Sequence, residues 1–138
     1  METVDRRAFL PAVILLIPAL AASVRRSLRG KLRQRGGKAF LETAAGSMVA
    51  LEGDDPTTGV LKDERLAGAD LEVMGEAVAP DRFVVGPIHT KAMFVHKDGK
   101  RLLITYWCDV CSIRTYTPGK CWCCQQETQL DLRESVDQ

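Results

Sequence analysis

The sequence predicts a mainly β protein: a small barrel or sandwich, preceded by an apolar N-terminal helix and followed by a cysteine cluster. Two observations support this fold class. In the middle of the chain, short apolar segments alternate with turn residues at a spacing of about 8–12 residues, which is typical of small all-β domains. All five cysteines lie between Cys108 and Cys124. A chain of 138 residues allows one domain with a modest core, so a metal or cross-links would help to stabilise it.

Residues 1–24 are predicted to be a signal for export or a membrane anchor. A short charged start is followed by an uncharged run over residues 8–24. This run is short for a spanning helix, which needs about 20 residues, and long for the apolar part of a signal peptide, which has about 7–15. The segment DRRAFL, residues 5–10, resembles the twin-arginine export signal, and small residues suited to cleavage follow at 19–22. That resemblance implies export in a folded state, often with a cofactor already bound.

A basic stretch follows the apolar run. Seven of the 19 basic residues lie within residues 25–38, with no acid among them. Lys and Arg beside a membrane segment tend to stay cytoplasmic, and the same stretch can lie on anionic headgroups. We expect membrane association through residues 8–24 and the basic stretch, with a periplasm-facing domain favoured over a cytoplasm-facing one. Residues 25–46 are interpreted as a basic linker and a short helix that ends near Gly46.

Residues 47–107 are predicted to form the small β domain. The strongest local signal is a hairpin over residues 91–107, where two apolar runs flank Asp98-Gly99, a pair that accepts positive φ at both turn positions. The strand spacing is compatible with an OB-like barrel. The second hairpin strand leads directly into Cys108, so the sheet is expected to hold the start of the cysteine cluster. Further strand patterns bounded by turn clusters occupy residues 47–53, 69–78 and 82–86.

Residues 108–132 are predicted to form a metal-binding tail, followed by a disordered end at residues 133–138. Two C-x2-C pairs are separated by nine residues. A C-x2-C turn brings both sulfurs to one side of a tight loop, where an ion binds them at about 2.3 Å. The two pairs resemble a zinc ribbon, which implies a structural zinc ion. Zinc ribbons usually carry glycine after the second cysteine of each pair, whereas Ser112 and Gln125 stand there. The four predicted ligands are Cys108, Cys111, Cys121 and Cys124.

The cysteine pattern is also compatible with other metals and with thiol chemistry. Cys123 has no place in a four-thiolate site and is an alternative ligand or a redox thiol. Thiolates also bind iron or an iron–sulfur cluster, a C-x-x-C dithiol can exchange disulfides, and an exported protein can form structural disulfides. We favour zinc. Trp107 and Trp122 flank cysteines and are expected to shield the site from water.

The sequence favours a binding role over an enzymatic one, because no catalytic constellation can be derived from residue spacing. His89 and His96 are separated by an odd offset, which places them on opposite faces of one continuous strand. A net charge of +1 and an aromatic content of 6% disfavour a nucleic-acid binder. We therefore expect an accessory or assembly subunit with a protein partner of unknown identity. The alternative is a redox or electron-transfer protein that uses an iron centre or a C-x-x-C dithiol.

Overall fold

The computed structural model describes residues 26–136. The predicted export signal and the apolar run, residues 1–24, lie outside the described residues. Within residues 26–136 the protein is mainly β, as predicted, and none of its helices has the length and apolar character that crossing a membrane requires.

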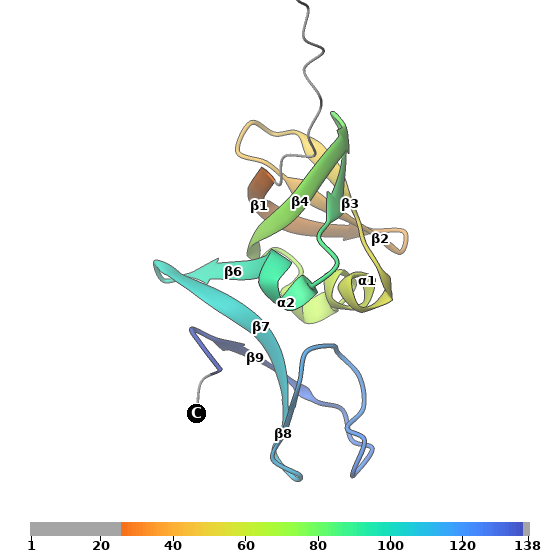
Figure 1. Ribbon diagram of the computed structural model, residues 1–138, viewed down its shortest axis with the longest axis vertical. Coiled ribbons are helices and arrows are strands. Elements are labelled where there is room, and N and C mark those ends of the chain that lie inside the picture. Colours follow the sequence, from red (N-terminus) through yellow and green to blue (C-terminus); the bar gives the residue numbers. More distant parts are fainter. Residues whose placement is uncertain (1–25, 137–138) are drawn as a thin grey trace, which may run out of the picture.

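Five strands form a closed barrel at the upper end of the molecule (Figure 1). The strands follow the order β1-β2-β3-β5-β4, and a β1–β4 pairing closes the ring. All neighbours are antiparallel except β3 and β5. A closed barrel leaves none of these five strands with a free edge. The bounds are β1 Arg26–Arg35, β2 Lys38–Glu42, β3 Met48–Glu52, β4 Asp70–Ala79 and β5 Arg82–Val85.

The barrel core is made by alternate residues of these strands. In β4, for example, Leu71 and Val73 are fully buried while their neighbours are partly exposed. Between β3 and β4 lie the helix α1 (Asp55–Leu61) and the short 3-10 helix η2 (Glu64–Leu66), whose apolar side chains join the same core. Asp54 caps α1 by accepting a hydrogen bond from the Thr57 backbone N–H.

The basic stretch is a barrel strand, and the predicted linker is wrong. In β1 the buried Leu32 and the half-buried Leu28 alternate with outward charges. Two of these charges are bound by neighbouring strands, since Arg29 pairs with Asp70 of β4 and Arg33 pairs with Glu42 of β2. The apolar alternation was hidden because basic residues fill the outward positions. The acids that pair with Arg29 and Arg33 lie outside the stretch, 41 and 9 positions along the chain.

The helix predicted after this stretch is also wrong, because residues 38–42 form β2. Ala39 and Leu41 face the core and are buried, while a turn at Gly36-Gly37, with φ of 57° and 76°, returns the chain beside β1. Cross-strand pairing overrides the local helix preference. The β domain therefore begins at Arg26, earlier than the predicted boundary.

The predicted hairpin is confirmed. β6 (Met93–Lys97) and β7 (Lys100–Cys108) pair around Asp98 and Gly99, whose φ values are 54° and 75°. β6 also pairs with β4, which joins the hairpin to the barrel. A short helix, α2 (His89–Ala92), precedes it.

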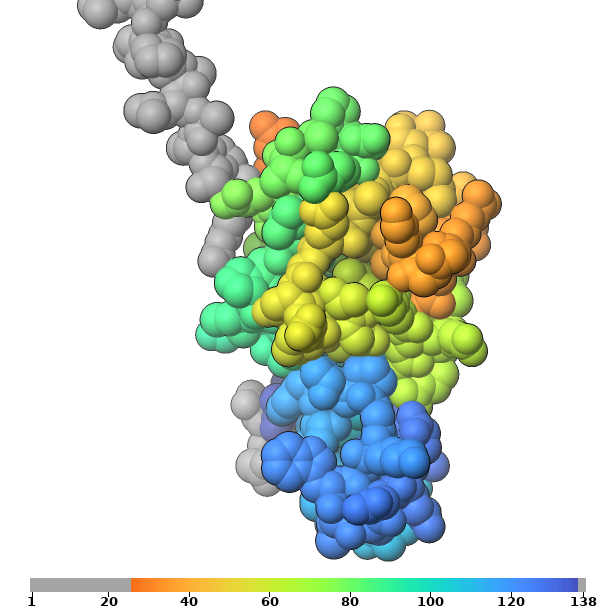
Figure 2. All heavy atoms as spheres, turned by 90° about the vertical axis from the view of Figure 1, so that its right-hand side faces the viewer, coloured from red at the N-terminus to blue at the C-terminus, as the bar shows by residue number. Residues whose placement is uncertain are grey.

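The end of the long strand β7 forms a C-terminal lobe together with the segments that follow it. β7 runs out of the barrel region into the lower part of the molecule (Figure 1). There β7 pairs with β8 (Ile113–Thr115) and β9 (Gln129–Arg133). Figure 2 shows this lobe, in blue, as a distinct body below the barrel. The end predicted as disordered starts within β9, because Arg133 pairs with Leu103.

Candidate metal centre

The four predicted ligands lie together in the C-terminal lobe. One sulfur atom from each of them lies within 4.8 Å of all the others. Cys108 ends β7, Cys111 follows in the turn before β8, and the other two belong to the loop before β9. A tetrahedral zinc site with Zn–S bonds of about 2.3 Å has sulfur–sulfur edges of about 3.8 Å. The sulfur atoms of Cys108 and Cys124 lie 3.5 Å apart, which is close to the length of such an edge.

The two cysteine loops close with equivalent backbone hydrogen bonds. In the first loop the Ser112 N–H donates to the Cys108 carbonyl at 2.8 Å, and in the second the Gln125 N–H donates to the Cys121 carbonyl at 2.9 Å. Ser112 and Gln125 have φ of 54° and 61°. Both residues therefore adopt the left-handed conformation that glycine usually supplies at this position. The missing glycines do not prevent either loop from closing.

Replacing Ser112 or Gln125 with glycine is expected to stabilise the protein. A side chain in the left-handed region costs roughly 1–2 kcal/mol, although glycine also has more freedom to lose on folding. We expect each variant to gain about 0.5–1 kcal/mol in free energy of unfolding, measured by urea denaturation. Ala44→Gly, a change outside the lobe, serves as the control. A loss of stability in both loop variants would contradict the expectation.

Backbone N–H groups polarise the first cysteine of each loop in the same way. The N–H groups of Cys124 and Cys123 point at the Cys121 sulfur and lower the pKa of that thiol to about 7. The N–H groups of Cys111 and Val110 act likewise on Cys108, but burial and the thiols of Cys124 and Cys121 raise the pKa of Cys108 above its ordinary value. Oriented backbone donors of this kind stabilise thiolates, which are the metal-binding form of cysteine.

Burial of the cluster is uneven. Cys108 and Cys121 are buried, Cys111 and Cys124 are half-buried, and Cys123 is exposed. Cys123 does not belong to the group of four, although its thiol lies near enough to Cys111 to be the main cause that raises the pKa of Cys111. The geometry therefore brings together the four predicted ligands and leaves Cys123 at the surface beside them.

The tryptophans do not shield the cluster as expected. Trp122 is 89% exposed, because it occupies the tip of the second loop between two cysteines. Trp107 precedes Cys108 on β7, and adjacent strand residues point to opposite faces. Its ring lies under the guanidinium of Arg114, at 4.9 Å from the ring centroid.

The histidines lie away from the cluster. His89 contacts the Tyr116 carbonyl through Nε2 at 2.7 Å, and His96 contacts Glu72 Oε1 through Nε2 at 2.7 Å. Each imidazole therefore has a partner within the protein, and neither belongs to the four-residue group.

An anchor that connects the barrel to the C-terminal lobe was missed from the sequence. Arg65 of η2 donates to the Thr128 carbonyl at 2.7 Å and also lies over the Tyr106 ring, 5.3 Å from its centroid. Thr128 is buried and bonds to the Gly119 carbonyl through its hydroxyl at 2.9 Å. The sequence around Arg65 is typical of an ordinary charged turn. It therefore carries no local signal that Arg65 connects the barrel to the lobe.

Asp63 holds Arg65 in place and should make the anchor dependent on pH. Its side chain is only 6% exposed and pairs with Arg65 at 2.9 Å. Burial alone would raise the pKa of Asp63, but the hydrogen bonds from Arg65 hold that pKa below its ordinary value. A carboxyl with a lowered pKa stabilises the fold above its unfolded pKa of about 3.9, and this contribution disappears as the pH falls through the folded pKa.

Asp63→Asn is therefore expected to lower the free energy of unfolding by about 1.5–3 kcal/mol at pH 7. The deficit relative to the unmodified protein should begin to shrink below about pH 4, where the unfolded carboxyl takes up a proton. It should be smallest below the lowered folded pKa, where the native carboxyl is protonated as well. Denaturation curves of both proteins at several pH values test this. Glu76→Gln, at an exposed position of β4, is the control. A deficit that stays constant down to pH 2 would show that Asp63 acts through packing alone.

No family model, characterised protein or solved structure matches this chain. Its function is therefore inferred from the four-cysteine site and from the barrel.

Proposed function

We propose that this protein binds one zinc ion through Cys108, Cys111, Cys121 and Cys124, and that the ion holds the C-terminal lobe in shape. The observation that carries the proposal is the convergence of four sulfurs within 4.8 Å of one another from two matching loops. Four cysteine ligands complete a tetrahedron, which is typical of structural zinc, whereas catalytic zinc keeps one position for water or substrate. The zinc therefore supports the fold and leaves function to other surfaces.

The whole protein is proposed to act as an accessory or assembly subunit. The strand order, the parallel β3–β5 pair and the helix between β3 and β4 support an OB-like barrel, an architecture that binds ligands on its surface. Membrane association, with the domain facing the periplasm, is proposed through residues 8–24. Because Arg29 and Arg33 are already paired with acids, the basic stretch has less charge to offer headgroups than its sequence implies.

A redox or electron-transfer role is the second candidate, favoured by one observation. Cys123 is exposed beside four clustered thiols, a position suited to exchange with a partner thiol. Iron held by the same four sulfurs would serve the same role.

Metal analysis of the purified full chain in mild detergent, together with a visible spectrum under reducing conditions, tests the proposal. One zinc per chain and no visible absorption is the expected result. Iron with a charge-transfer band would establish the electron-transfer alternative, because zinc is colourless and has no redox chemistry. A chain that takes up no metal while its thiols are reduced would refute the metal site.

A further inference from the structure

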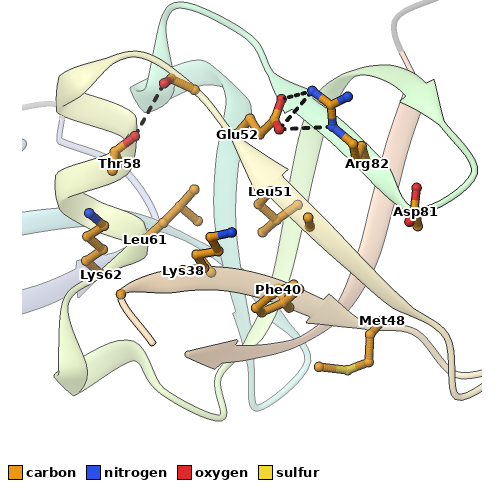
Figure 3. Close-up of a pocket in the computed structure, with 14 residues that line it drawn as sticks. Lys38, Phe40, Met48, Leu51, Glu52, Thr58, Leu61, Lys62, Asp81 and Arg82 are labelled. Carbon is orange, nitrogen blue, oxygen red and sulfur yellow. Dashed lines mark hydrogen bonds and ion pairs between the residues drawn. The ribbon is translucent and has the colours of Figure 1, made fainter. Parts of the chain in front are cut away.

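A groove runs over the outer face of β2 and β3, and none of the five cysteines lines it. It has a volume of about 580 Å³ and is bordered by α1, by the β1–β2 turn and by the β4–β5 turn. Figure 3 shows that its lining combines an apolar floor with charged side chains along the edges.

The floor follows from strand alternation. Because Ala39 and Leu41 of β2 point into the core, Phe40 points outward, and Met48 and Ala50 of β3 do so for the same reason. Phe40 lies directly opposite Ala50 in the β2–β3 register. Phe40, Met48 and Ala50 are half-buried and line the groove. Because the Ala50 side chain is small, we infer a hollow beside the phenyl ring. One apolar side chain of a ligand can fill such a hollow.

The charges around the floor are unequal. Two nitrogens of the Arg82 guanidinium donate to the two carboxylate oxygens of Glu52, each at 3.0 Å, so the two charges cancel. Within residues 26–136, neither Lys38 nor Lys62 has an ion-pair partner. Figure 3 places these two lysines on one side of the groove and Asp81 on the opposite side. The lysine side therefore offers two cations to a ligand.

This lining fits a peptide better than a nucleic acid or a sugar. Phe40 is the groove's one aromatic residue, and base recognition on a β surface uses several stacking rings with a continuous basic groove. Asp81 would repel phosphates. A sugar needs many neutral donors and acceptors, whereas Thr58 is the single hydroxyl side chain of the lining.

We propose that the groove binds an extended segment of a partner protein in which an apolar side chain stands next to acidic residues. The apolar side chain fills the hollow beside Phe40 and Ala50, and the carboxylates contact Lys38 and Lys62. This inference rests on the proposed assembly role and names its partner surface. It does not depend on which metal the cysteines hold.

Selection from a phage-displayed library of random dodecapeptides tests the inference on the full chain in mild detergent. Enriched peptides are expected to carry Asp or Glu beside Leu, Ile or Phe. The best peptide, made synthetically, should bind the double variant Lys38→Glu/Lys62→Glu about tenfold more weakly, as expected when two surface attractions become repulsions. Ala50→Leu, which fills the hollow, should also weaken binding.

Controls separate this inference from the metal proposal. Lys91→Glu/Lys97→Glu makes the same charge change at exposed positions outside the groove and should bind the peptide normally. Metal content is measured on every variant, so a failed metal site is recognised independently. Enrichment of basic peptides, equal binding by the groove variant, or no enrichment would overturn the proposed peptide site.

Discussion

Replacing Cys121 with serine is expected to remove the metal and to unfold the C-terminal lobe while the barrel stays folded. Among residues 109–128, only Cys121 and Thr128 are buried, so the two loops have no hydrophobic core of their own. The bound ion would take the place of that core, because structural metal binding contributes directly to folding. Serine keeps the size of the side chain but supplies no thiolate. A reduction of metal content to near zero is the expected result.

Hydrogen exchange locates the expected unfolding. Amides of β8 and of the two cysteine loops should lose their protection in Cys121→Ser, while those of β2 and β4 should keep it, since the barrel strands pair with one another. Chelation of the unmodified protein should give the same pattern. Cys123→Ser is the matched control, because it removes an exposed thiol outside the group of four, and it should retain the metal. Loss of metal from the control, or full retention in Cys121→Ser, would show that the ligand set is wrong.

Gly75→Ala is expected to be the most damaging single change in the barrel. Gly75 belongs to β4 and pairs with β1 on one side and β5 on the other, opposite Arg26 and Val85. A Cβ atom at this position would lie 2.0 Å from the Val84 carbonyl oxygen and 2.9 Å from its carbon. Because these are backbone atoms, the ladder itself must move. We expect a loss of about 3 kcal/mol or more in the free energy of unfolding.

The same substitution at Gly59 provides a matched control for the barrel prediction. Gly59 lies in α1, and a Cβ atom there would meet its nearest neighbour, Pro118, at an ordinary 3.9 Å. Alanine favours a helix over glycine by about 1 kcal/mol, so Gly59→Ala should stabilise the protein. Chemical denaturation of the two variants gives both values. Similar effects of the same sign would contradict the close-approach explanation for Gly75.

The first barrel strand, β1, could not be predicted from its own sequence, because its pairing is divided between two other strands. β1 uses Arg26–Lys31 to pair with β4 and Lys31–Arg35 to pair with β2. Gly30 precedes Lys31, where the strand changes partner, and a Cβ atom at Gly30 would lie 2.3 Å from the Glu42 carbonyl oxygen. A fragment that begins at Lys38 would lack this strand and leave the barrel open. The strands and carbonyl groups that β1 contacts all lie outside this segment of the sequence.

The sequence by itself determined those features that depend on neighbouring residues. Asp98-Gly99 specifies a tight turn through its tolerance of positive φ, and each C-x2-C pair specifies a loop that presents two sulfurs. The mainly β class and the identity of the four clustered cysteines followed from such local signals.

The tertiary structure alone decided how distant segments meet. β1 became a strand because β2 and β4 supply pairing partners and the acids that bind Arg29 and Arg33. Arg65 became an anchor because η2 lies beside Thr128, 63 positions along the chain. These contacts depend on the closure of the barrel and on the docking of the lobe, and the energy of such long-range pairing is set by the partner as much as by the segment.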